Sequence, residues 1–424
     1  MTAPDSRDGV DGGARCAELV ALARTCIPPY RGRERDHLSS TELPLVEHAI
    51  ELYESVLERA SEVYLGEARV RHDLVHALVL LGNDRRYRGL VDLERVAFRR
   101  ALEVSRAALE RNPDDAWLHY KQGIAHRALL EPEAAVTAFD RAMAAGERIS
   151  SAARVRPVEP ELLASATDVR MRASFERAAS LMRCGSFERA RIALDALNAE
   201  PGNDHLREGI HRSLAHLSAC CDDPAGARAH LRQAVGSAVD HTYAVQPLLE
   251  SWILAADDRE RAECAASMRD LLEHAPWVED ELRWERVLMA FDIGMEERAP
   301  RRSESESSSR TPDPAVVAAH ADASCFDDAR PESLASCAEA EERRRNDDRA
   351  RLPQLRAAAW LHAGVALELL AERASAPEQR AELQERSRAA YDAVLTADVE
   401  RAWVERTYAT WRRARLDAPR HGKG

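Results

Sequence analysis

The chain has 424 residues, enough for two or three ordinary domains or for one extended array. Hydrophobic residues make up 45% and charged residues 31%, which excludes wholesale disorder, and the net charge of −13 disfavours non-specific binding to nucleic acid. No apolar run approaches the ~20 residues of a membrane span, and the polar first thirteen residues do not resemble a signal or transit peptide. We therefore expect a soluble, cytoplasmic protein without nucleic-acid or membrane partners.

Helical spacing of apolar residues dominates the N-terminal part of the chain. We expect residues 1–13 to be disordered and residues 14–64 to form helices, the first of which ends at Pro28. A further pattern starts at Val70 and is predicted to close at Gly82. No stretch shows convincing strand alternation, so the sequence predicts an all-α fold.

An internal repeat follows, and we assign it to residues 65–295. A small residue is followed twelve positions later by a small residue, at sixteen by a large one, and at nineteen by a small or apolar one. Small residues at these positions allow two helices to touch, and the large residue fills the space beside them. Three stretches share the spacing: Gly123, Ala135, Phe139, Ala142; Ala178, Ala190, Leu194, Leu197; and Ala215, Ala227, Leu231, Ala234.

The repeat resembles the tetratricopeptide repeat, whose unit of about 34 residues is a helix-turn-helix. The best-matching stretch is residues 116–143, and Pro113 ends the helix before it, as the family's proline does. Its matching residues are Trp117, Tyr120, Gly123, Ala135, Phe139 and Ala142. The resemblance implies a helical solenoid with a concave face that binds proteins or peptides.

Spacing between the repeats is uneven. The second-helix alanines Ala101, Ala135, Ala190, Ala227 and Ala262 are 34, 55, 37 and 35 residues apart. The 55-residue step predicts an insertion between Glu147 and Arg172 that holds a short extra helix. The last unit is degenerate, because Glu250 stands where a small residue is expected.

Beyond the repeats, residues 296–314 are rich in Ser, Glu, Arg and Pro and are predicted to be a flexible linker or loop. Residues 315–417 carry helical patterns again, with Pro377 between two stretches at 355–370 and 381–416, and residues 418–424 form a tail. We expect this C-terminal helical segment to form a hairpin that caps the array.

Candidate catalytic features have structural interpretations that we favour. His72 and His76 lie four residues apart on a predicted helix and suggest a metal-dependent enzyme, yet no third ligand is evident. Paired aspartates such as Asp114–Asp115 and Asp222–Asp223 precede helices and are predicted to be N-caps. The eight scattered cysteines are predicted to be buried free thiols. We expect no catalytic residue, metal or cofactor.

The leading functional hypothesis is a protein- or peptide-binding scaffold or adaptor. One alternative is a peptide-sensing regulator with a separable C-terminal module, and a second is a metal-dependent enzyme that uses His72 and His76. The resemblance implies that the first helix of each unit supplies the groove, and its side chains suggest a partner with apolar anchors and acidic residues. The predicted groove residues are Trp117, Tyr120, Ile124, Arg127, Arg172, Phe175, Met182, Arg212 and His216.

Overall fold

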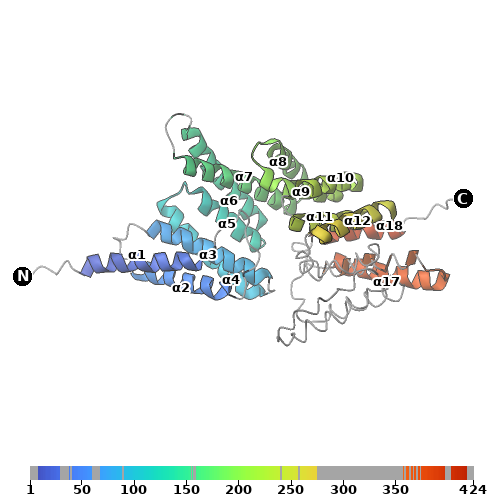
Figure 1. Ribbon diagram of the computed structural model, residues 1–424, viewed down its shortest axis with the longest axis horizontal. Helices are drawn as coiled ribbons and strands as arrows, with labels where there is room; N and C mark the ends of the chain where they lie inside the picture. The colour runs from blue at the N-terminus through green and yellow to red at the C-terminus, as the bar shows by residue number, and fades with distance from the viewer. Residues whose placement is uncertain are drawn as a thin grey trace, which may run out of the picture. The chain divides into compact units, whose positions relative to one another are not determined.

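The computed structural model describes residues 8–28, 38, 41–59, 67–87, 90–153, 155, 159–238, 241–255, 258–274, 357, 360–361, 364–365, 367–368, 371–372, 374–396 and 403–417. All regular structure within these residues is helical, with no strand, which confirms the predicted all-α helical solenoid (Figure 1). The chain forms two compact units, residues 1–206 and residues 207–424, which we call the N-terminal and C-terminal units. The division falls inside the predicted repeat segment 65–295.

The N-terminal unit is a succession of helices, each packed on the next. Helix α5 also contacts α3 and α7, so the first helices of consecutive pairs lie side by side. Short connections join the two helices of each pair. The elements are α1 (Asp8–Cys26), α2 (Glu42–Arg59), α3 (Glu67–Tyr87), α4 (Val91–Arg111), α5 (Ala116–Ala128), α6 (Pro132–Ala153), α7 (Pro160–Arg183), α8 (Phe187–Ala199) and a 3-10 turn at Asp204–Leu206.

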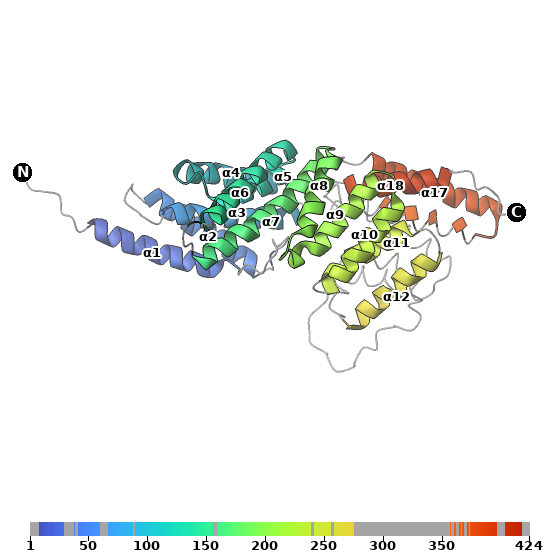
Figure 2. The same cartoon turned by 90° about the horizontal axis from the view of Figure 1, so that it is seen from above.

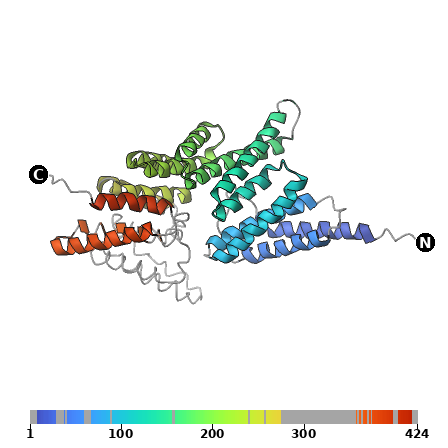
Figure 3. The ribbon, with the colours of Figure 1, turned by 180° about the vertical axis from the view of Figure 1, so that it is seen from behind.

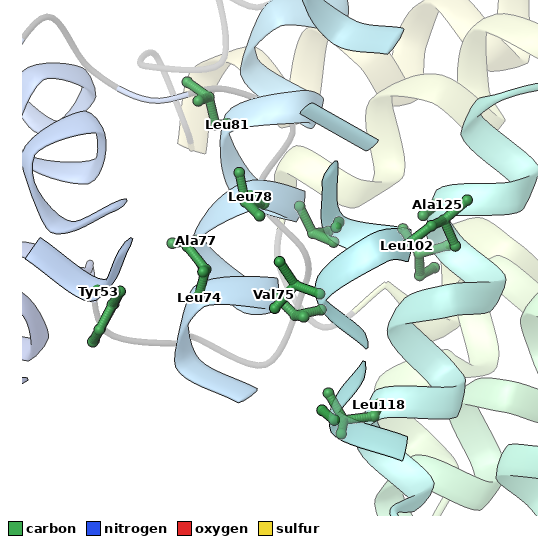
Figure 4. Packing of buried hydrophobic residues seen from close by; sticks show 14 of the residues in the cluster. Tyr53, Leu74, Val75, Ala77, Leu78, Leu81, Leu102, Leu118 and Ala125 are labelled. Atoms are coloured by element: carbon green, nitrogen blue, oxygen red, sulfur yellow. The ribbon is translucent and has the colours of Figure 1, made fainter. Parts of the chain in front are cut away.

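A single apolar cluster runs through this unit from α1 to α7. Leu74 and Ala77 lie on the side of α3 that faces Tyr53 of α2, whereas Val75 lies on the side toward Leu102 of α4 (Figure 4). Each helix has a neighbouring helix on two of its sides and therefore buries residues on both of those sides. This is the nearest-neighbour packing of a repeat protein.

The predicted repeat spacing is confirmed where α5 meets α6. A Cβ atom on Gly123 would lie 2.4 Å from Cε1 of Phe139, and Ala135 and Ala142 are fully buried. Only a residue without a side chain permits so close an approach of an aromatic ring. The sixteen-residue offset from Gly123 to Phe139 therefore corresponds to one direct contact between the two helices.

The same contact occurs one pair earlier and corrects the predicted end of α3. A Cβ atom on Gly82 would lie 2.8 Å from Cζ of Phe98, again sixteen residues on. Gly82 therefore lies inside α3, which runs on to Tyr87, and does not end the helix. In this pair Ala101 lies nineteen positions after the glycine and therefore corresponds to Ala142. The predicted equivalence of Ala101 and Ala135 is wrong, although both residues are buried.

The 55-residue step has a different cause from the one predicted. The described residues hold no separate helix between α6 and α7; the two helices are themselves long, with 22 and 24 residues. They meet closely, because a Cβ atom on Gly146 would lie 2.9 Å from the carbonyl oxygen of Ala166. The extra residues lengthen one hairpin.

The C-terminal unit contains α9 (Arg207–Cys220), α10 (Pro224–Ser237), α11 (His241–Leu254), α12 (Asp258–His274), α17 (Pro377–Leu395) and α18 (Trp403–Asp417). Helices α9, α10, α11 and α12 follow one another side by side (Figure 2). Helix α18 contacts both α9 and α17. The two C-terminal helices α17 and α18 are the orange and red ribbons of Figure 3. The stretch predicted over 381–416 is therefore two helices, and the first of them begins at Pro377.

One apolar cluster joins the C-terminal helices to the repeat helices of this unit. It contains Leu231 and Trp252 together with Tyr391 and Tyr408. A third glycine–aromatic contact lies here, since a Cβ atom on Gly364 would be 2.4 Å from Cε1 of Tyr391. The predicted linker 296–314 and the pattern at 315–323 lie outside the described residues.

Several local predictions have clear outcomes. Asp115 caps α5 and Asp223 caps α10, each accepting a hydrogen bond from a backbone N–H, as predicted. Helix α1 begins at Asp8, inside the segment expected to be disordered. The described cysteines are free, but only Cys16 and Cys26 are buried as predicted. Cys184, Cys220 and Cys264 are half-buried, and Cys221 is exposed. No helix among the described residues is long and apolar enough to cross a membrane.

Candidate functional site

The nine predicted groove residues divide between the two units. Seven, from Trp117 to Met182, lie on α5 and α7 of the N-terminal unit, and Arg212 and His216 lie on α9 of the C-terminal unit. Each group is therefore treated within its own unit. Their binding role stays a prediction, and the structure shows what each side chain contacts.

On α5 the predicted aromatic residues pack against their neighbours. Tyr120 is 2% exposed, and its ring meets the edge of Trp117 at a centroid distance of 5.5 Å. The indole Nε1 of Trp117 donates a hydrogen bond to Oγ of Ser165 on α7 at 2.9 Å. The ammonium of Lys121 lies 5.6 Å from the Trp117 ring and 5.7 Å from the Tyr120 ring, a cation–π arrangement. Tyr120 is thus a core residue here, and Trp117 is only half-buried.

Predicted arginines in this unit are held by carboxylates. Arg127 of α5 forms an ion pair with Glu176 of α7, with side-chain exposures of 24% and 14%. Arg172 is buried and its Nε lies 2.8 Å from Asp168 one helical turn earlier. Arg127 was predicted only as a groove residue, and its carboxylate partner was not predicted. Pairing is the physical outcome because a half-buried guanidinium without a partner is unfavourable.

The remaining predicted residues of this unit differ in accessibility. Ile124 and Met182 are buried, with 2% and 3% exposure, whereas Phe175 is only half-buried. Of the predicted groove residues in this unit, Trp117, Arg127 and Phe175 are accessible. Glu176, which was not predicted, is accessible as well and pairs with Arg127. These side chains come from α5 and α7, which lie in contact.

In the C-terminal unit, Arg212 and His216 bind the carboxylate of Glu250 on α11. Nε of Arg212 lies 2.8 Å from Oε1, and Nε2 of His216 lies 2.8 Å from Oε2. The hydroxyl of Tyr408 on α18 donates to Oε2 at 2.9 Å. Glu250 is 2% exposed, so the carboxylate is buried and bound by three groups from two other helices.

The electrostatics of this cluster follow from its partners. Burial would raise the pKa of Glu250, but the charges of Arg212 and His216 and the hydrogen bonds from His216 and Tyr408 outweigh it and lower the pKa to about 2. The pKa of Glu405 on α18 shifts in the opposite direction. Burial, and the nearby charge of Glu250, raise its pKa to about 7. One carboxyl is thus held ionised beside another that titrates near neutral pH.

A second polar cluster fixes the other half of α18. Arg412 is fully buried; its Nη1 donates to Glu368 at 3.3 Å, and its Nη2 donates to the carbonyl oxygen of Ile253. Nη1 of Arg415 donates to the carbonyl oxygen of Ala255 at 3.3 Å. These carbonyl groups belong to the C-terminal end of α11, where positive side chains are favourable.

Six residues of these clusters were not predicted from the sequence: Glu250 as a binding group, Glu368, Glu405, Tyr408, Arg412 and Arg415. Glu250 gave a signal, since a carboxylate at a helix-contact position needs partners when buried. The four-residue spacing of Tyr408 and Arg412 places them on one face of α18. Nothing in the sequence pairs them with α9 or α11.

His72 and His76 are the histidines on which the metal-dependent enzyme alternative depends. Nδ1 of His72 lies 3.7 Å from Asp73, and Asp73 forms an ion pair with Arg24 at 2.8 Å. Within the described part of the chain, no three His, Cys, Asp or Glu side chains are grouped so that they could hold a metal ion. Asp73 is thus already bound by a guanidinium.

Fold and site together define an all-α protein of stacked helix hairpins whose buried charges bind one another. Neither a scan against protein-family models nor a search of curated proteins found a match to the chain. Likeness to the tetratricopeptide repeat therefore rests on the residue pattern and stays a prediction.

Proposed function

We propose that the chain is a protein- or peptide-binding scaffold that uses the first-helix face of its N-terminal unit. The observation that carries the proposal is the side-by-side packing of α5 with both α3 and α7. Consecutive first helices in contact create a surface longer than any single hairpin offers. A surface of this kind suits an extended or helical segment of another protein.

The chemistry of the accessible residues indicates the kind of partner. Trp117 and Phe175 offer apolar and aromatic area, and Arg127 offers a guanidinium that is only half-buried. Aromatic and arginine side chains dominate binding energy at interfaces. An acidic group on the partner would share Arg127 with Glu176, so we propose a partner with apolar anchors and acidic residues.

Binding to a peptide library displayed on phage tests this proposal. The full chain should enrich peptides that combine aromatic or aliphatic residues with Asp or Glu. Two variants, Phe175→Ala and Arg127→Glu, should weaken binding of the enriched peptides by tenfold or more. Arg148→Glu is the matched control, because Arg148 lies on the second helix α6 and pairs with Asp114 just before α5, and both side chains are exposed, at 55% and 69%.

The result also separates the alternatives. If the library enriches nothing, or if Arg148→Glu weakens binding as much as Arg127→Glu does, the first-helix face is not the binding surface. Helical content and Tm of each variant are measured alongside, so that loss of the Arg127–Glu176 pair is not mistaken for loss of a contact.

A separable C-terminal regulator and a metal-dependent enzyme remain less supported candidates. The described C-terminal helices share an apolar cluster with α9, α10 and α11, which does not favour a module that acts independently. No observation on the described residues favours catalysis by His72 and His76.

A further inference from the structure

Helix α18 covers the face of α9 that the repeat pattern assigns to partner binding. The ring of His216 meets Tyr408 edge-on at a centroid distance of 6.1 Å. Sγ of Cys220 lies 3.4 Å from Oγ1 of Thr407. Arg212 and Tyr408 bind the two oxygens of the same Glu250 carboxylate. A segment distant in sequence therefore occupies the position expected for a bound helix.

Polar groups anchor this contact at two successive turns in the middle of α18. Tyr408 donates to Glu250, and Arg412, one helical turn later, binds Glu368 and the carbonyl oxygen of Ile253. Helix α18 contributes the buried Tyr408 and Ala409 and the partly buried Val404, Trp411 and Leu416 to the apolar cluster of this unit. Buried ion pairs define geometry well but add little net stability, since desolvation offsets their attraction. The polar groups thus define where α18 lies on the face, and apolar residues pack beside them.

The titration of Glu405 adds to this picture. Its carboxyl faces Glu250, Arg212 and Tyr408, and its pKa is raised to about 7 by burial and by the charge of Glu250. When α18 leaves the face, the carboxyl returns to water and ionises at its ordinary, lower pKa. Release of α18 is therefore favoured as pH rises from about 4.5 to about 7.

We propose that α18 is an internal ligand that occupies, within the same chain, a helix-binding face formed by α9 and α11. The external competitor that fits this face is an amphipathic helix carrying a tyrosine and, four residues later, an arginine, which would bind Glu250 and Glu368. The proposal rests on the scaffold function and deepens it: one binding face is self-occupied until α18 is displaced.

A labelled synthetic peptide of residues 403–417 tests the proposal when it is added to the full chain. The wild-type chain should bind the peptide weakly because its own α18 holds the face. Tyr408→Ala in the chain removes the internal hydrogen bond to Glu250 and should tighten peptide binding by tenfold or more. Thr410→Ala is the matched control, because Thr410 is exposed on the same helix and bonds only within it.

Hydrogen exchange of the same chains guards against simple unfolding. In Tyr408→Ala the amides of 403–417 should exchange faster while those of α9 and α11 keep their protection. Arg415→Ala, at a side chain that is 32% exposed, is a milder second variant with the same expected direction. If α9 and α11 lose protection together with α18 in both variants, or if neither variant binds the peptide more tightly than the wild type, α18 is a permanent core helix and the proposal is wrong. Peptide selection by the Arg127 and Phe175 face is measured separately, so either proposal can fail alone.

Discussion

The position that a Cβ atom of Gly123 would take lies 2.4 Å from Cε1 of Phe139, far inside van der Waals contact. Phe139 is fully buried between α5 and α6, so its ring has no room to move aside. This contact repeats between Gly82 and Phe98, so the α3–α4 and α5–α6 hairpins are each closed by a ring resting on a bare backbone. The hairpins therefore depend on a missing side chain as much as on the aromatic residue.

Gly123→Ala should destabilise the N-terminal unit by about 1–3 kcal/mol, because the added methyl group overpacks the interface. Gly236→Ala is the control: a Cβ atom there meets nothing within 4 Å, so the helix propensity of alanine should leave stability unchanged or slightly raised. Urea unfolding followed by circular dichroism measures both. Equal effects of the two substitutions would show that the close approach to Phe139 does not govern stability.

Glu250→Ala should destabilise the C-terminal unit by about 3–5 kcal/mol, because it leaves Arg212 and His216 without their shared buried carboxylate. Asp114→Ala removes an exposed ion pair with Arg148 and should change stability by less than about 1 kcal/mol. Thermal unfolding of the two variants compares a buried with an exposed carboxylate. A small effect of Glu250→Ala would mean that the cluster is open to water in solution.

Acid should weaken the contact between α9 and α10. The rings of His211 and His230 stack at a centroid distance of 6.1 Å, and neither buried Nδ1 has a hydrogen-bond partner. Burial, with the nearby charges of His230 and Arg207, lowers the pKa of His211 below 6.5. The unfolded chain then binds more protons as pH falls through about 6.5, so this stability is present above that pH and lost below it.

The Tm of His211→Phe should therefore fall less than the Tm of the wild type when the pH is lowered from about 7.5 to about 5.5. Protonation of Glu405 raises stability as the pH falls over part of this range, which is opposite to the effect of His211. Both chains are therefore compared in the Glu405→Gln background. His48→Gln serves as control, at a side chain that is 51% exposed on α2. An identical pH dependence in His211→Phe and wild type would contradict the prediction.

Metal analysis of the purified full chain should find no stoichiometric zinc, iron or manganese. Of the groups around His72, Asp73 is held by Arg24, and three grouped ligands are lacking in the described residues. His76→Ala should leave the metal content unchanged. About one metal ion per chain that this substitution removes would make the enzyme alternative the leading one.

The sequence by itself determined the helical class, the N-caps at Asp115 and Asp223, and the small–large–small spacing that sets α5 on α6. These features are local: a cap acts within three residues, and a hairpin contact lies within about twenty. The resemblance to the tetratricopeptide repeat also suggested Trp117 and Arg127 as groove residues. It did not show that Arg127 would pair with Glu176, because that depends on which helix packs alongside.

Only the tertiary structure decided the fate of Glu250. Its partners are Arg212, 38 positions earlier, and Tyr408, 158 positions later, and no periodic pattern connects them. A charged residue at a small-residue position indicates that it needs partners when it is buried. Which hydrogen-bond donors offset the cost of burial depends on the helices that the fold brings near. Helix α9 supplies two of those donors, Arg212 and His216, and α18 supplies the third, Tyr408.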